Sequence, residues 1–142
     1  MEHANWMLAW SDGMLMGVPE LDAADQRMSL LLHDLNQAIA ADSEGAERLM
    51  QELLLDALSH FEEEERVLSD RAYPLSKGHA ALHAQIRAEL EHAAEELRQI
   101  KIPAMRAEYG LLVTQLLVEH MRQETLKYRH FLGSASASAD GA

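Results

Sequence analysis

The sequence has no cysteine among its 142 residues. Disulfides, thiolate zinc sites and cysteine-ligated iron–sulfur clusters are therefore excluded, so a bound metal would have only nitrogen and oxygen ligands. Basic residues are also scarce, with 12 Lys and Arg against 24 Asp and Glu. Because an acidic surface repels phosphate backbones and anionic lipids, we expect no nucleic-acid partner.

Long apolar runs are missing as well. No stretch approaches the roughly 18 uninterrupted apolar residues of a membrane span. Residues 1–10 contain Glu2 and lack the basic start of a secretion signal. We therefore expect a cytoplasmic protein without a membrane partner, and the length predicts a single domain with a sizeable core.

Apolar residues recur at helical spacing in four segments of the chain. We predict helices that begin near Pro19, after Gly45, near Ser76 and near Ala104, with the last one ending at Gly133. Short connections between such helices are typical of an all-α, up-down-up-down antiparallel four-helix bundle. The predicted organisation is an extended N-terminal arm over residues 1–18, the bundle over residues 19–133 and a disordered tail over residues 134–142.

Three pairs of potential metal ligands lie within the apolar stripes of these helices. The pairs are His60 with Glu64, His79 with His83, and His120 with Glu124. Residues four apart share one face of a helix, so each pair can present two donors to one point. Asp25 is the polar member of the first helix's apolar seam. In an up-down-up-down path all these positions fall at one end of the bundle, which predicts a metal site inside a helical core.

The spacing alone is weak evidence, because chance produces some such pairs in a chain with eight His. His92 and Glu96 have the same spacing but fall on the solvated face of their helix. A single buried histidine is more often hydrogen-bonded to a neighbour than bound to metal, and only the set of pairs favours ligation. We interpret Glu62, Glu63 and Glu65 as surface charge. We expect no ligation by His3, His33 and His130, which lie off the convergent end of the bundle or in a flexible context.

Imidazoles and carboxylates without thiolates suit iron, manganese or zinc. Seven ligands exceed the number that one tetrahedral zinc takes, whereas two metals bridged by carboxylates use them all. The ferritin-like diiron class uses Glu-x-x-His motifs, and that spacing occurs here only at Glu89 with His92. The number and spacing of these ligands therefore favour a dinuclear site that differs from those of the usual diiron oxidases.

The combination of these motifs resembles the hemerythrin-like family, in particular the bacterial hemerythrins. The resemblance covers Trp6 to Phe131 and rests on the following segments: Gly17-Val18-Pro19-Glu20-Leu21-Asp22, His60-Phe61-x-x-Glu64-Glu65, Tyr73-Pro74, His79-x-x-x-His83, and His120-Met121 with Tyr128.

The resemblance implies two iron ions (Fe2+/Fe3+), bridged by an oxo or hydroxo group and by carboxylate. In this reading His79, His83 and His120 bind one iron, His60 binds the other, and Glu64 bridges them. It further implies reversible binding of O2 at one open coordination position.

The sequence departs from the family pattern at two positions. Asp25 stands where the family has a first-helix His, and Thr125 stands where the family has a bridging Asp. Glu124 is one residue away and offers a plausible second bridge. Asp25 either ligates the second iron, reaches it through water, or is an acidic residue favoured by the helix dipole.

Three functions remain open from the sequence. The leading hypothesis is an O2-binding protein for carriage, storage or sensing rather than an enzyme. The second is a diiron oxidase, peroxidase or NO-handling enzyme, which the additional carboxylate motivates. The third is a helical interaction module with a degraded metal site. The expected partner is O2 or another small diatomic molecule or peroxide, and the sequence identifies no protein partner.

Overall fold

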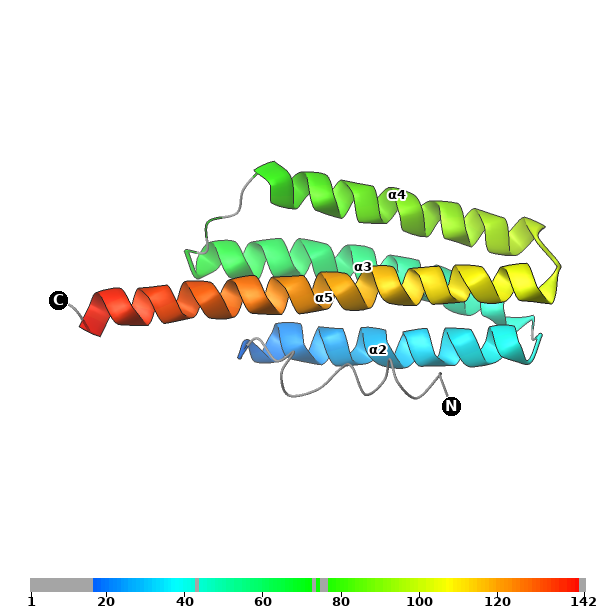
Figure 1. Cartoon of the computed structure of the whole chain (residues 1–142), viewed down its shortest axis with the longest axis horizontal. Helices are drawn as coiled ribbons and strands as arrows, with labels where there is room; N and C mark the ends of the chain where they lie inside the picture. Colours follow the sequence, from blue (N-terminus) through cyan, green and yellow to red (C-terminus); the bar gives the residue numbers. More distant parts are fainter. Residues whose placement is uncertain (1–16, 43, 73, 75–76, 141–142) are drawn as a thin grey trace.

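The computed structural model describes residues 17–42, 44–72, 74 and 77–140. Four helices make up most of these ranges (Figure 1): α2 Pro19–Ala40, α3 Gly45–Asp70, α4 Lys77–Gln99 and α5 Pro103–Asp140. The described ranges contain no strand, so the prediction of an all-α chain is confirmed. The predicted N-terminal arm lies outside the described residues except for its last two. None of the described helices combines the length and the apolar character that a membrane span requires.

The helices begin and end at residues whose backbone chemistry favours a boundary. Pro19 opens α2 and Pro103 opens α5, positions where the missing N–H is no loss and the fixed φ angle suits a helix. The side chain of Asp22 accepts a hydrogen bond from the backbone N–H of Gly17 at 3.1 Å, which fixes the start of α2. Beyond α2 the chain turns at Asp42 with a φ angle of 51°, and aspartate is among the few residues that visit this left-handed region.

The last helix is longer than the sequence predicts. Its predicted end at Gly133 is wrong, because α5 continues to Asp140 and thereby includes most of the segment predicted to be disordered. Residues 134–140 are Ser, Ala and Asp without proline, so no residue there forbids helical backbone. A glycine inside a helix costs only about 1 kcal/mol relative to alanine. Gly133 is therefore insufficient to end α5.

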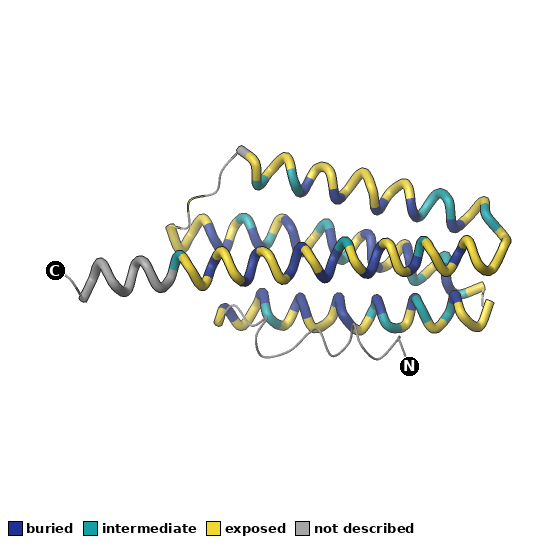
Figure 2. Tube along the Cα trace, viewed as in Figure 1, coloured by how far each residue is buried: buried dark blue, intermediate teal, exposed yellow. Residues whose placement is uncertain are grey.

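The four helices pack as a closed group. α2 packs against α3 and α5, and α4 packs against the same two helices. Figure 2 shows buried residues recurring along each helix between exposed ones, as expected when one stripe of each helix faces a shared core. The chain therefore forms a four-helix bundle.

Among the described residues, the core consists of two apolar clusters with a polar layer between them. The larger cluster contains residues of all four helices, among them Met28, Phe61, Ile86 and Met121. The smaller cluster consists of Val18, Leu21, Val67, Leu68 and Tyr128. On α2, Asp25 lies between Leu21 of the smaller cluster and Met28 of the larger one. On α3 and α5, Glu64 and Glu124 likewise lie between residues of the two clusters. The polar layer is thus enclosed by apolar side chains on two sides.

Candidate metal centre

Every helix contributes to the polar layer. It contains all seven residues that the sequence singles out: Asp25 on α2, His60 and Glu64 on α3, His79 and His83 on α4, and His120 and Glu124 on α5. None of these side chains is more than 8 % exposed. The periodicity that buries the apolar stripe of each helix also turns these polar side chains inward.

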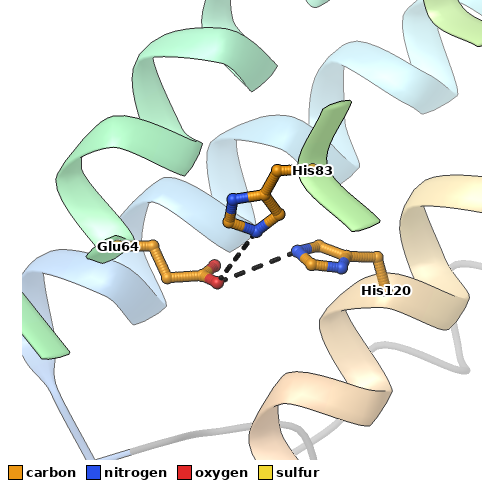
Figure 3. Close-up of side chains that lie close together, drawn as sticks. All are labelled: Glu64, His83 and His120. Atoms are coloured by element: carbon orange, nitrogen blue, oxygen red, sulfur yellow. Dashed lines mark ion pairs between the residues drawn. The ribbon is translucent and has the colours of Figure 1, made fainter. Parts of the chain in front are cut away.

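Glu64 lies at the centre of the layer. Its Oε1 atom is 3.4 Å from Nε2 of His83, 3.5 Å from Nε2 of His79 and 3.8 Å from Nε2 of His120. Figure 3 shows the rings of His83 and His120 directed at the Glu64 carboxylate from two other helices. These atoms form one face of the layer, which we call the three-histidine face: Glu64 Oε1 and the Nε2 atoms of His79, His83 and His120.

The second carboxylate oxygen of Glu64 faces a different pair. Its Oε2 atom lies 3.5 Å from Nε2 of His60, and the same nitrogen is 2.8 Å from Oδ1 of Asp25. Burial raises the pKa of Asp25 in spite of its hydrogen bond with His60. Burial lowers the pKa of His60, but the hydrogen bond and the charge of Asp25 outweigh it and raise this pKa overall. Asp25 and His60 therefore form a closely coupled pair beside Glu64.

Glu124 extends the three-histidine face along α5. Its Oε1 atom is 3.7 Å from Nδ1 of His79, the nitrogen opposite the one that faces Glu64. Thr125, the next residue, is buried as well but has a hydroxyl group in place of a carboxylate. Of these two neighbours on α5, only Glu124 brings a carboxylate to the layer.

Glu65 has a contact that the sequence did not predict. We interpreted it as surface charge, yet its Oε1 atom lies 2.7 Å from Nδ1 of His83. When Nδ1–H donates to Glu65, the lone pair of His83 is on Nε2, the atom that faces Glu64. Glu65 thus orients His83 as an outer carboxylate orients a metal-bound imidazole. Its place one residue after Glu64, on the side of α3 that packs against α4, was the available signal.

Phe61 supports the same histidine from the apolar side. Its ring stacks on that of His83 with centroids 4.4 Å apart and an interplanar angle of 12°. It also meets the ring of His120 edge-on at 5.1 Å. Both imidazoles are therefore held by packing as well as by polar contacts.

Burial dominates the electrostatics of the layer. It lowers the pKa of His120 from 6.5 to about 4, which leaves this imidazole neutral at pH 7 with a lone pair to offer. Burial, reinforced by the charge of Glu64, raises the pKa of Glu124 from 4.5 to about 7. Burial also raises the pKa of Glu64, but the surrounding imidazoles outweigh it and hold this pKa below its usual value. A carboxylate anion among imidazoles is an environment that attracts a cation.

Several polar atoms of the layer have no hydrogen-bond partner among the described residues. They include His60 Nδ1, Glu64 Oε1, His83 Nε2, both ring nitrogens of His120 and both carboxylate oxygens of Glu124. Leaving a buried polar atom unsatisfied costs roughly 1 to 3 kcal/mol. One cation among these donors would satisfy several of them together.

Among the described residues, three sets of potential ligand atoms converge closely enough to hold a metal ion. Within each set the atoms lie within 4.8 Å of one another: Glu64 with His83 and His120, Glu64 with His79 and Glu124, and Glu65 with His79 and His83. Asp25 and His60 belong to none of these sets and contact each other instead. The buried cluster therefore has the donors, the charge and the unsatisfied atoms that a metal ion requires.

In the described part of the chain, hollows reach the layer on both sides of the first turns of α4. One has a volume of about 470 Å³ and is lined by His79, Leu82 and Lys127 among others. The other has a volume of about 200 Å³ and is lined by residues including Phe61 and His83. Both expose part of an imidazole of the cluster to small molecules.

The histidines that we excluded from the site lie elsewhere where they are described. His92 is exposed on α4 and meets the ring of Tyr109 at 6.3 Å. His33 and His130 belong to no set of converging ligand atoms among the described residues, and His3 lies outside the described residues. His92 is thus a natural control position on the helix that contains His79 and His83.

Comparisons with protein-family models, curated proteins and solved structures found no match. A function for this chain therefore has to be argued from its site.

Proposed function

We propose that the chain is a hemerythrin-like protein that binds O2 reversibly at a non-haem diiron centre, for carriage, storage or sensing. The observation that carries this proposal is the position of Glu64, whose two carboxylate oxygens face two different sets of donors. Oε1 faces His79, His83 and His120, and Oε2 faces His60. A carboxylate with this arrangement is suited to bridge two cations.

The proposed fold is the up-down-up-down antiparallel bundle that the sequence predicts. In Figure 1 the α2–α3 and α4–α5 connections lie at one end of the bundle, and the end of α3 and the start of α4 lie at the other. This path puts the early residues of α2 and α4 level with the late residues of α3 and with His120 of α5. It accounts for ligands from four helices in one layer.

In the proposed centre His79, His83 and His120 would hold one iron and His60 would hold the other, with Glu64 between them. Glu124 would supply a further carboxylate beside the three-histidine face, and Asp25 would do so beside His60. Iron in this setting supplies the electrons that O2 accepts on binding. The protein's residues fix the imidazoles through Glu65 and Phe61, and the two apolar clusters exclude bulk water on two sides.

A second candidate is a diiron oxidase, peroxidase or NO-handling enzyme. It is favoured by the number of carboxylates in the layer, because Asp25 and Glu124 are both buried within it. More negative charge around the metals stabilises the ferric state, which opposes O2 release and favours turnover. The hollow beside His79 and Lys127 gives such an enzyme a cationic approach for a small substrate.

Anaerobic loading with Fe(II), followed by metal analysis and optical spectra before and after O2, tests the proposal. We expect two irons per chain and an oxygenated absorption band that disappears when O2 is removed. His92→Gln is the matched control and should behave as the parent does. A band that decays irreversibly, together with repeated turnover of peroxide and a reductant, would favour the enzyme. Iron content near zero would refute both and favour an interaction module without metal.

A further inference from the structure

The two sides of Glu64 differ in how far their donors are already engaged. On the three-histidine face, Nε2 of His83 and Nε2 of His120 lie 3.4 and 3.8 Å from Oε1 of Glu64, farther than a good hydrogen bond. On the other side, Nε2 of His60 lies 2.8 Å from Oδ1 of Asp25. We propose that the two metal positions are unequal and fill in a fixed order, the three-histidine face first and the His60 side second, after the Asp25–His60 pair opens.

This inference rests on the proposed dinuclear centre and adds to it the order of loading. The first position is prepared in the metal-free protein. Oε1 of Glu65 lies 2.7 Å from Nδ1 of His83, and the neutral tautomer that donates Nδ1–H to Glu65 has its lone pair on Nε2, on the side of Glu64. Phe61 stacks on the same ring. A cation that enters here separates Glu64 Oε1 from imidazole nitrogens that are already 3.4 to 3.8 Å away, so reorganisation takes little from its binding free energy.

The second position requires an exchange at one atom. Nε2 of His60 cannot donate a proton to Asp25 and offer a lone pair to a cation at the same time. The proton has to move to water or to Nδ1, which has no hydrogen-bond partner among the described residues. Asp25 must also turn from His60 toward the cation. Both side chains are at most 3 % exposed, so water offers little compensation while the pair is open.

A titration of the metal-free protein with Zn2+, followed by calorimetry and by NMR of the histidine ring protons, tests the order. Zinc is a diamagnetic probe that accepts the same imidazole and carboxylate ligands. We expect two binding events, the second at least about 100-fold weaker than the first. The first equivalent should shift the ring signals of His83 and His120. The hydrogen-bonded ring proton of His60 should persist through that equivalent and disappear during the second.

Three variants separate the two positions. His60→Gln should abolish the second event and leave the dissociation constant of the first unchanged within about threefold. His120→Gln should weaken the first event by at least about tenfold, as expected for loss of a ligand. His92→Gln replaces a histidine at an exposed position of α4 and should leave both events unchanged.

Two zinc ions of equal affinity, or loss of the His60 proton with the first equivalent, would overturn the order while leaving the dinuclear centre in place. A single zinc ion at saturation, with the His60 proton still present, would refute the second position and with it the dinuclear centre. The failure of this inference alone is therefore distinguishable from the failure of the proposed function.

Discussion

Replacing Glu124 by glutamine should stabilise the metal-free protein and weaken the metal-loaded one. The carboxylate is buried, and both of its oxygens lack a hydrogen-bond partner among the described residues. Burial and the charge of Glu64 raise its pKa from 4.5 to about 7. In the absence of metal the charged form is therefore an unfavourable neighbour for Glu64, and glutamine removes the charge with little change of shape.

The size of the effect follows from the pKa. A difference of roughly 2.5 units at about 1.4 kcal/mol per unit corresponds to about 3 kcal/mol. An acid whose pKa is raised on folding binds its proton more tightly in the native state, so stability is lost as pH rises from about 4.5 to about 7. The cost of the charge is absent near pH 4 and complete above about pH 7. The benefit of glutamine should follow the same course.

Urea unfolding of chelator-treated protein at pH 5 and pH 8 measures this. At pH 8 we expect Glu124→Gln to exceed the parent in unfolding free energy by about 1 to 3 kcal/mol, with a smaller gap at pH 5. Calorimetry with Zn2+ should show weaker binding to the variant. Glu119→Gln is the control, since Glu119 is an exposed glutamate on the same helix. A variant that is less stable than the parent at pH 8 without metal would refute the reasoning.

Three further predictions concern the same layer. Glu65→Gln should raise the dissociation constant of the first metal ion by about 10- to 100-fold in calorimetry, while the helix content by circular dichroism stays unchanged. Glu62 is an exposed residue of the same helix, so Glu62→Gln should have no effect, and equal effects of the two variants would contradict a specific contact with His83. Metal at 100 times its dissociation constant should raise the unfolding free energy by about 2.7 kcal/mol, measured by urea unfolding with and without chelator; no rise would mean that the metal does not bind the folded layer. Asp25→Ala should lower the unfolding free energy of the metal-free protein at pH 7 by about 3 kcal/mol, since it leaves His60 buried without its partner; a loss below about 1 kcal/mol would indicate that water replaces the carboxylate.

Much of the scaffold follows from local signals in the sequence. Pro19 and Pro103 mark helix starts because proline is tolerated only in the first turn. The phase of His60 and Glu64 within the α3 stripe places them inside because burial follows the apolar periodicity. The convergence of the three ligand pairs could be predicted because short connections between the helices imply an up-and-down path that brings the pairs to the same level. The end of α5 was missed, since glycine lowers helix stability by an amount that neighbouring residues can offset.

The contacts that decide the chemistry of the layer depend on distances between helices, which a sequence does not contain. Glu65 reaches His83 because α3 and α4 pack together at this level. The pairing of Asp25 with His60 likewise depends on the separation of α2 from α3. The spacing in the sequence identifies which residues face inward, but it cannot say which of them satisfy one another and which remain open to a ligand.

Stability alone does not account for this layer. Replacing a buried ionic group by well-packed apolar residues is often neutral or stabilising, and apolar clusters already lie on both sides of the layer. Asp25 and His60 approach each other to 2.8 Å, whereas His120 and Glu124 are buried with ring nitrogens and carboxylate oxygens that lack hydrogen-bond partners among the described residues. Such atoms oppose folding unless something binds them. A ligand that is cationic and small enough to lie among imidazoles within 4.8 Å of one another satisfies these atoms directly, and a metal ion has both properties.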